Sequence, residues 1–139
     1  MWEWVTGPAM SRLARRVEIS GRSGVLLVGD LAAIGLFVLL GEIRHGGTLR
    51  SGAFTYAEFG AGWVIAAVAV GAYAGDALSS RGRAVALAGG GWVLGALLGQ
   101  VIRSYVKPGF YVAPTFLAVT IGVGGVLLVG WRLLAAELL

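Results

Sequence analysis

Four long runs of apolar residues dominate the pattern of hydrophobic and polar positions along the chain. They span residues 24–43, 59–78, 84–102 and 112–134. Each run is close to the ~20 residues that an α-helix needs to cross a hydrocarbon layer of ~30 Å. Apolar and polar residues do not alternate within the runs, as they would in the strands of a membrane barrel. The pattern therefore predicts an all-α fold, a four-helix transmembrane bundle that occupies residues 24–139.

The segment 1–23 has a different pattern and is not a membrane span. Met10, Leu13 and Val17 recur at helical spacing, which predicts a short amphipathic helix on the cytoplasmic membrane surface. Trp2 and Trp4 are of a type that favours the lipid–water interface. The basic residues expected to contact lipid headgroups are Arg12, Arg15, Arg16 and Arg22. The alternative interpretation is a frayed N-terminal tail.

The composition agrees with a membrane protein. Of the 139 residues, 58% are hydrophobic and 13% are charged, whereas soluble domains carry about 25% charged residues. The net charge of +4 would indicate a nucleic-acid partner in a soluble protein. Here the arginines flank apolar runs instead of lining one face, so we expect membrane lipids as partners and no nucleic acid.

Basic residues are unevenly divided between the two sides of the predicted bundle. One side collects seven: Arg12, Arg15, Arg16, Arg22, Arg81, Arg83 and Arg132. The other side collects four: Arg44, Arg50, Arg103 and Lys107. The positive-inside rule then places both termini in the cytoplasm, with the cell membrane as the expected location.

Glycine is unusually frequent, with 24 residues, many of them inside the predicted spans. Small residues allow transmembrane helices to approach closely. Two stripes have a small residue at every fourth position: Gly91, Gly95 and Gly99 in one span, and Ala67, Gly71 and Gly75 in another. The stripes are expected to face each other or a neighbouring subunit. The second arrangement would make the protein a homo-oligomer or a subunit of a membrane complex.

Asp30 interrupts the first apolar run. It lies about 9 Å from the end of that span, where an unpaired charge would cost several kcal/mol. Arg132 in the fourth run and Asp76 at the end of the second have a similar depth. We therefore expect an inner polar cluster of Asp30, Asp76 and Arg132, with a direct contact between Asp30 and Arg132.

A second set of polar residues gathers at the opposite ends of the spans. This outer polar cluster consists of Glu42, Arg44, His45, Glu58, Gln100 and Arg103. A Glu42–Arg103 pair, with His45 or Glu58 beside it, is geometrically possible because these residues lie at the same side of the membrane. Both clusters have three interpretations. Buried pairs would fix the register of the helices. Alternatively, Asp30 or Glu42 would be protonated during transport, or the cluster would hold a polar ligand. In the third, these side chains extend to water at the membrane surface.

Motifs for catalysis are missing from the sequence. There is no G-x-S-x-G, no H-E-x-x-H and no phosphate-binding loop. The glycine-rich stretch AGGGWVLG (88–95) lies inside a predicted span and does not follow a strand. The chain has no cysteine and a single histidine, His45. We therefore expect no catalytic residue, no metal site and no cofactor, and a protein that is not an enzyme.

Three segments carry a resemblance to a known family. They are DLAAIGLFVLLGEIRHG (30–46), GWVLGALLGQVIR (91–103) and PTFLAVTIGVGGVLLVGWRLL (114–134). These segments resemble DUF3054, a family of small prokaryotic integral membrane proteins. The resemblance implies a fold of four spans and no assigned activity. It singles out Asp30, Gly41, His45, Arg103, Trp131 and Arg132. The chain departs from the family pattern at Glu58-Phe59, where a Pro-Phe pair is expected.

Three functions remain open on these observations. The first is a non-enzymatic structural or accessory protein that self-associates through the glycine stripes. The second is a small transporter or channel that uses Asp30 and Glu42. The third is a lipid- or isoprenoid-binding membrane protein. An ion-paired Asp30 in a packed bundle would favour the first, and an Asp30 that faces a hydrated cavity would favour the second.

Overall fold

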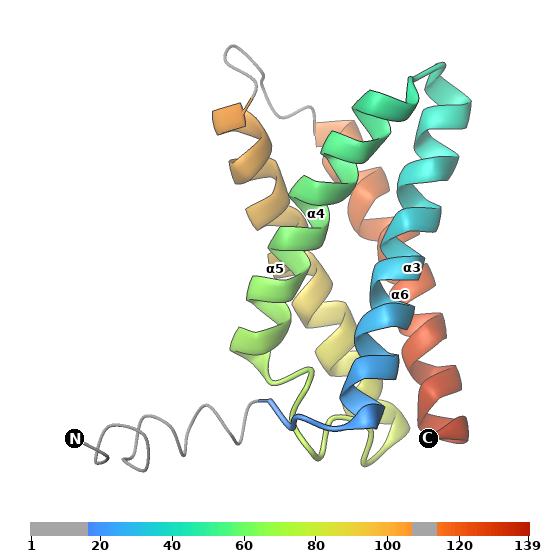
Figure 1. The fold of residues 1–139 in the computed structure, drawn as a ribbon, viewed down its shortest axis with the longest axis vertical. Coiled ribbons are helices and arrows are strands. Elements are labelled where there is room, and N and C mark those ends of the chain that lie inside the picture. The colour runs from blue at the N-terminus through green and yellow to red at the C-terminus, as the bar shows by residue number, and fades with distance from the viewer. Residues whose placement is uncertain (1–16, 107–113) are drawn as a thin grey trace, which may run out of the picture.

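The computed structural model describes residues 17–106 and 114–139, which form a bundle of four α-helices (Figure 1). The helices are α3 (Gly21–His45), α4 (Leu49–Val70), α5 (Arg81–Val106) and α6 (Pro114–Leu138). All four are long and apolar enough to cross a membrane. The predicted all-α bundle is confirmed. Within the described ranges the β structure is limited to an isolated bridge between Val17 and Tyr73.

Successive helices run in opposite directions, so the start of α3 and the end of α6 lie at the same end of the bundle (Figure 1). The predicted amphipathic helix of the segment 1–23 falls largely on residues 1–16, outside the described part, together with Arg12, Arg15 and Arg16. Arg22 is described and belongs to the first turn of α3. Because α3 begins at Gly21, the boundary expected after residue 23 falls inside this helix.

The second helix is displaced from its predicted span of 59–78. α4 begins at Leu49 because Thr48 caps its first turn. The Thr48 hydroxyl accepts a hydrogen bond from the Ser51 N–H at 3.1 Å, and the Ser51 hydroxyl accepts one from the Thr48 N–H at 3.0 Å. α4 ends at Val70 because Gly71 adopts a left-handed conformation with φ 88°. The connection expected over residues 44–58 therefore shrinks to residues 46–48.

An irregular segment, residues 71–80, follows α4 and passes beneath the bundle. Ala72 and Tyr73 are buried in it. The Tyr73 carbonyl accepts a hydrogen bond from the Glu18 N–H at 2.8 Å, and the Gly75 carbonyl accepts one from the Arg22 guanidinium at 3.1 Å. Segment 71–80 is thus held against the residues that lead into α3.

Helices α4 and α5 pack closest where glycines meet. A Cβ atom on Gly95 would lie 3.0 Å from the Trp63 Cα, and a Cβ on Gly62 would lie 2.8 Å from the Gly99 backbone nitrogen. The predicted stripe of Gly91, Gly95 and Gly99 therefore faces α4 of the same chain. The predicted partner stripe is wrong beyond Ala67, because Gly71 and Gly75 lie after the end of α4 and share no helix face with it.

Aromatic rings fill the middle of the bundle. Phe37 of α3, Phe59 of α4 and Trp92 of α5 have ring centroids 6.1–6.3 Å apart. The Trp92 indole N–H donates to the Thr120 carbonyl of α6 at 2.9 Å. We call Phe37, Phe59 and Trp92 the aromatic layer. It lies between the two groups of polar residues described below.

Candidate functional site

The strongest polar contact inside the bundle joins Asp30 of α3 to Arg132 of α6. Arg132 Nε donates to Asp30 Oδ1 at 2.9 Å, and Arg132 Nη2 donates to Asp30 Oδ2 at 2.7 Å. The third guanidinium nitrogen, Nη1, donates to the Ala72 carbonyl at 2.6 Å. Both side chains are 0% exposed. This two-point geometry is the strong form of an arginine–carboxylate pair.

Two aromatic side chains complete the surroundings of this pair. The Tyr73 hydroxyl donates to Asp30 Oδ2 at 2.5 Å and accepts from the Trp63 indole N–H at 2.9 Å. The Arg132 guanidinium also lies over the rings of Tyr73 and Trp63, at 5.1 and 5.8 Å from their centroids. We call Asp30, Trp63, Tyr73 and Arg132 the Asp30 network.

Burial raises the pKa of Tyr73, which belongs to the segment 71–80 outside the helices, and the neighbouring Asp30 carboxylate raises it further. The hydroxyl therefore keeps its proton and acts as a donor to Asp30. The Asp30 network has a donor for each carboxylate oxygen and an acceptor for each guanidinium nitrogen. Such an arrangement is suited to holding helices together.

Neighbouring residues fix the position of Arg132. The Trp131 ring lies on Gly29, at a place that any larger side chain would fill, and the Trp131 indole N–H donates to the Leu26 carbonyl at 3.4 Å. This contact places α3 and α6 close together next to Asp30. Asp76, which we expected in the inner polar cluster, is not part of it. It pairs instead with Arg83 at 3.1 Å on the surface, because segment 71–80 carries it away from Asp30.

The outer polar cluster is arranged around Arg103 of α5. Arg103 Nη1 donates to the Thr55 hydroxyl at 2.9 Å and lies 3.8 Å from Glu58 Oε1. Glu58 is therefore the acidic partner of Arg103, where we had expected Glu42. Glu58 and Gln100 are 4% and 3% exposed. Neither carboxylate oxygen of Glu58, and neither polar atom of the Gln100 amide, has a hydrogen-bond partner among the described residues.

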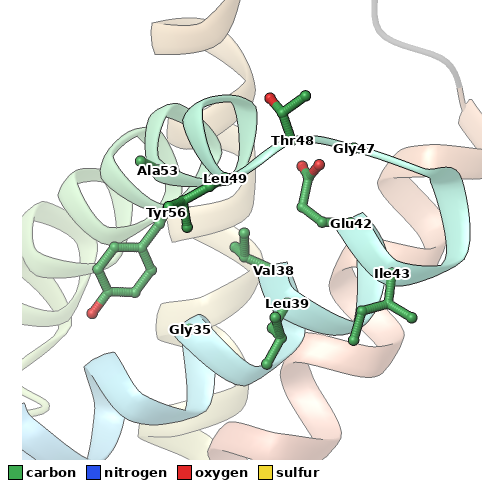
Figure 2. Close-up of a pocket in the computed structure, with 11 residues that line it drawn as sticks. Gly35, Val38, Leu39, Glu42, Ile43, Gly47, Thr48, Leu49, Ala53 and Tyr56 are labelled. Atoms are coloured by element: carbon green, nitrogen blue, oxygen red, sulfur yellow. The ribbon is translucent and has the colours of Figure 1, made fainter.

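Glu42 serves the start of α4 instead. Its Oε2 accepts a hydrogen bond from the Ser51 hydroxyl at 2.9 Å. Figure 2 shows the carboxylate below the turn at Gly47 and Thr48, at one end of a groove between α3 and α4. A negative charge at a helix N-terminus is favoured by the helix dipole. Glu42 therefore binds Ser51 and forms no ion pair with Arg103, although both residues line the cavity described next.

A cavity of about 510 Å³ opens at this end of the bundle. We call it the outer cavity. All four helices contribute to its wall, and its lining includes Phe37, Glu42, His45, Thr55, Arg103 and Phe116. The Arg103 guanidinium lies 5.6 Å from the centroid of the Phe116 ring. Arg44, the remaining member of the predicted cluster, is exposed and lies outside the lining.

The positions that the family resemblance singles out divide between these two places. Gly41, His45 and Arg103 line the outer cavity. Asp30 and Arg132 form the central pair, with Trp131 beside it. Sequence reasoning missed Tyr73, Trp63 and Thr55. The one available signal was that Tyr73 and Trp63 are polar-tipped aromatic residues within an apolar stretch, where their N–H and O–H groups need a partner.

Four antiparallel apolar helices with charged side chains turned inward define a multi-pass α-helical membrane protein. A family model described as a protein of unknown function, DUF3054, matches residues 27–135. The chain therefore belongs to the DUF3054 family. No curated protein and no solved structure matches the chain.

Proposed function

We propose that this protein is a non-enzymatic structural or accessory protein of the membrane, and that the Asp30 network holds its helices in register. The observation that carries this proposal is that Asp30 and Arg132 are both 0% exposed and bind each other at two points. A carboxylate that carries protons or ions needs contact with water. The aromatic layer further separates Asp30 from the outer cavity, which argues against a continuous path through one chain.

Proton flux into liposomes tests this proposal. The wild-type chain, reconstituted with a pH-sensitive dye inside the vesicles, should give no flux above that of empty liposomes under a pH gradient. Asp30→Asn should unfold more easily and should also give none. Flux in the wild type that disappears in Asp30→Asn would overturn the structural role. The wild-type measurement decides even where the variant does not fold.

Self-association is the second part of the proposal. The stripe of Gly91, Gly95 and Gly99 packs against α4, so a second copy would contact another face. Gly122 and Gly130 of α6 have open space where a Cβ would stand. They lie eight residues apart and therefore on one helix face. Native mass spectrometry from the membrane should show oligomers that Gly122→Leu and Gly130→Leu reduce. A wild-type chain that is monomeric at every concentration would contradict this part.

The proposed orientation places both termini in the cytoplasm of the cell. Arg132 and Arg103 are ion-paired inside the bundle. Once these two are left out, six basic residues remain on the side of the termini and three on the other side. The positive-inside rule counts charges in short loops and flanking segments. The ratio of basic residues between the two sides therefore rises from seven against four to six against three.

A further inference from the structure

We propose that the outer cavity binds an organic cation, a molecule with an apolar aromatic body and a protonated amine head. This inference goes beyond the structural role of the Asp30 network and does not depend on it, since the aromatic layer separates the two places. It rests on the shape of the cavity, on its charge, and on buried polar atoms beside it.

The size and the walls of the cavity suit a small organic molecule. Its volume of about 510 Å³ is within the range of roughly 300–1,000 Å³ that is usual for such sites. Phe37, Val38, Phe116 and Val119 supply apolar surface from two helices, α3 and α6. The Phe37 and Phe116 rings can stack on an aromatic body, and ring faces attract a nearby ammonium group.

The charges around the cavity favour a cation. Arg103 lines the cavity, and Glu58 lies 3.8 Å from it and balances its charge. Glu42 also lines the cavity, and its carboxylate has no ion-pair partner among the residues that the structure describes. The ionised side chains Glu42, Glu58 and Arg103 sum to one negative charge. An anionic head would gain little from Arg103, whose charge is already neutralised by Glu58. It would also be repelled by the unneutralised carboxylate of Glu42.

The buried polar atoms next to Arg103 favour a head that donates hydrogen bonds. Both oxygens of Glu58 lack a hydrogen-bond partner within the described ranges, as do the oxygen and the nitrogen of the Gln100 amide, so acceptors outnumber donors among these atoms. Buried acceptors without partners cost free energy and are rare in native proteins. Thr55 and Glu58 of α4 both contact Arg103 of α5, and Gln100 lies one turn before Arg103 on α5. Glu58 and Gln100 are not among the lining residues, so an ammonium group in the cavity would supply the charge to Glu42 directly and donors to these acceptors through a bridging water.

Three compounds of matched size separate the effect of the head group from that of the body. Phenylbutylamine, phenylbutanol and phenylbutyrate share one aromatic body and carry a positive, a neutral and a negative head. Binding is measured by calorimetry on the full chain in nanodiscs, with empty nanodiscs as the background. The amine should bind at least about tenfold more tightly than the alcohol, and the acid should bind most weakly. Equal binding of amine and alcohol, preference for the acid, or no binding at all would overturn the proposal.

A pair of variants assigns the charge to Glu42. Glu42→Gln removes the negative charge at nearly constant size and should weaken amine binding about tenfold while alcohol binding stays the same. Glu137→Gln is the matched control, because it makes the same chemical change at the opposite end of the bundle, where Glu137 pairs with Arg81. Amine binding should be unchanged in this control. Selective amine binding that survives Glu42→Gln would contradict the role of this carboxylate. The selectivity of the wild type decides the proposal where Glu42→Gln does not fold.

Discussion

Asp30 and Arg132 are separated by 102 positions in the sequence, yet they bind through two parallel hydrogen bonds of 2.9 and 2.7 Å in the interior of the bundle. The pair joins the first described helix to the last. Tyr73 and the Ala72 carbonyl add the segment that follows α4. One buried contact therefore connects three separate parts of the chain at a single depth.

Breaking this pair on one side should be costly. Asp30→Asn leaves the Arg132 guanidinium buried without its counter-ion, so we expect the free energy of unfolding to fall by about 3–5 kcal/mol. Unfolding by a titration with denaturing detergent measures the loss. The double variant with Arg132→Gln should lose less than the sum of the two single losses, because neither charge is then left alone. Strictly additive losses would show that the two residues do not interact.

Tyr73→Phe should destabilise the protein by about 1–3 kcal/mol, because Asp30 loses a donor and the Trp63 indole N–H loses its acceptor. The same detergent titration measures this change. Phe keeps the ring that lies beside Arg132, so the loss reports the hydroxyl alone. A variant as stable as the wild type would exclude a role for these two hydrogen bonds.

Tyr73 should also make stability depend on pH in the alkaline range. Burial raises its pKa in the folded protein above the ordinary value near 10.0. The folded state keeps the proton that the unfolded state releases, so the contribution of Tyr73 is complete below about pH 10 and is lost as the pH rises toward the folded value. The stability difference between wild type and Tyr73→Phe, measured from neutral pH upward, should therefore shrink above about pH 10. A constant difference would contradict the shift.

The contact between α4 and α5 should not tolerate a single added methyl group at Gly95. In Gly95→Ala the new Cβ would lie 3.0 Å from the Trp63 Cα, and backbone cannot move aside as a flexible side chain can. We expect a loss of about 1–3 kcal/mol in detergent unfolding. Gly90→Ala is the matched control on the same helix, where a Cβ has nothing within 4 Å. Equal stabilities of the two variants would show that α4 and α5 are not held this closely.

Reporter fusions test the orientation. A fluorescent protein that folds in the cytoplasm should be bright when fused after Leu139, and alkaline phosphatase, which needs an oxidising compartment, should be inactive there. Both signals should reverse for fusions in the short turn at Gly46–Thr48, between α3 and α4. A dark C-terminal fluorescent fusion that is present in the membrane would place the termini outside.

Hydropathy was sufficient to predict the four membrane spans found in the described part of the chain and the contact between Asp30 and Arg132. The runs had the length of a membrane span, and two opposite charges at one depth in hydrocarbon need each other. The start of α4 was harder to predict from the sequence. Turn-forming Gly and Ser residues indicated a loop over residues 44–58, although Glu58 is buried against Arg103 and Thr48 provides a helix cap.

The hydropathy pattern could not predict the hydrogen-bond partners that come from the irregular segment 71–80. Tyr73 and the Ala72 carbonyl reach Asp30 and Arg132 only because α4 stops at Gly71 and segment 71–80 turns under the bundle. Similarly, Glu42 and Glu58 both had a depth that matched Arg103. Choosing between them required the rotation of each helix about its axis, which depth alone does not give.

The aromatic layer of Phe37, Phe59 and Trp92 has a consequence for how changes at the two ends combine. Asp30 and Glu42 are on the same helix but about 18 Å apart along its axis, with this layer between them and no shared contact among those described. Losses of stability at such separated sites usually add to within about 0.5 kcal/mol. A substitution at Glu42 should therefore leave the ion pair of Asp30 and Arg132 as strong as before, so the outer end can change its polar residues while the helices stay joined at the other.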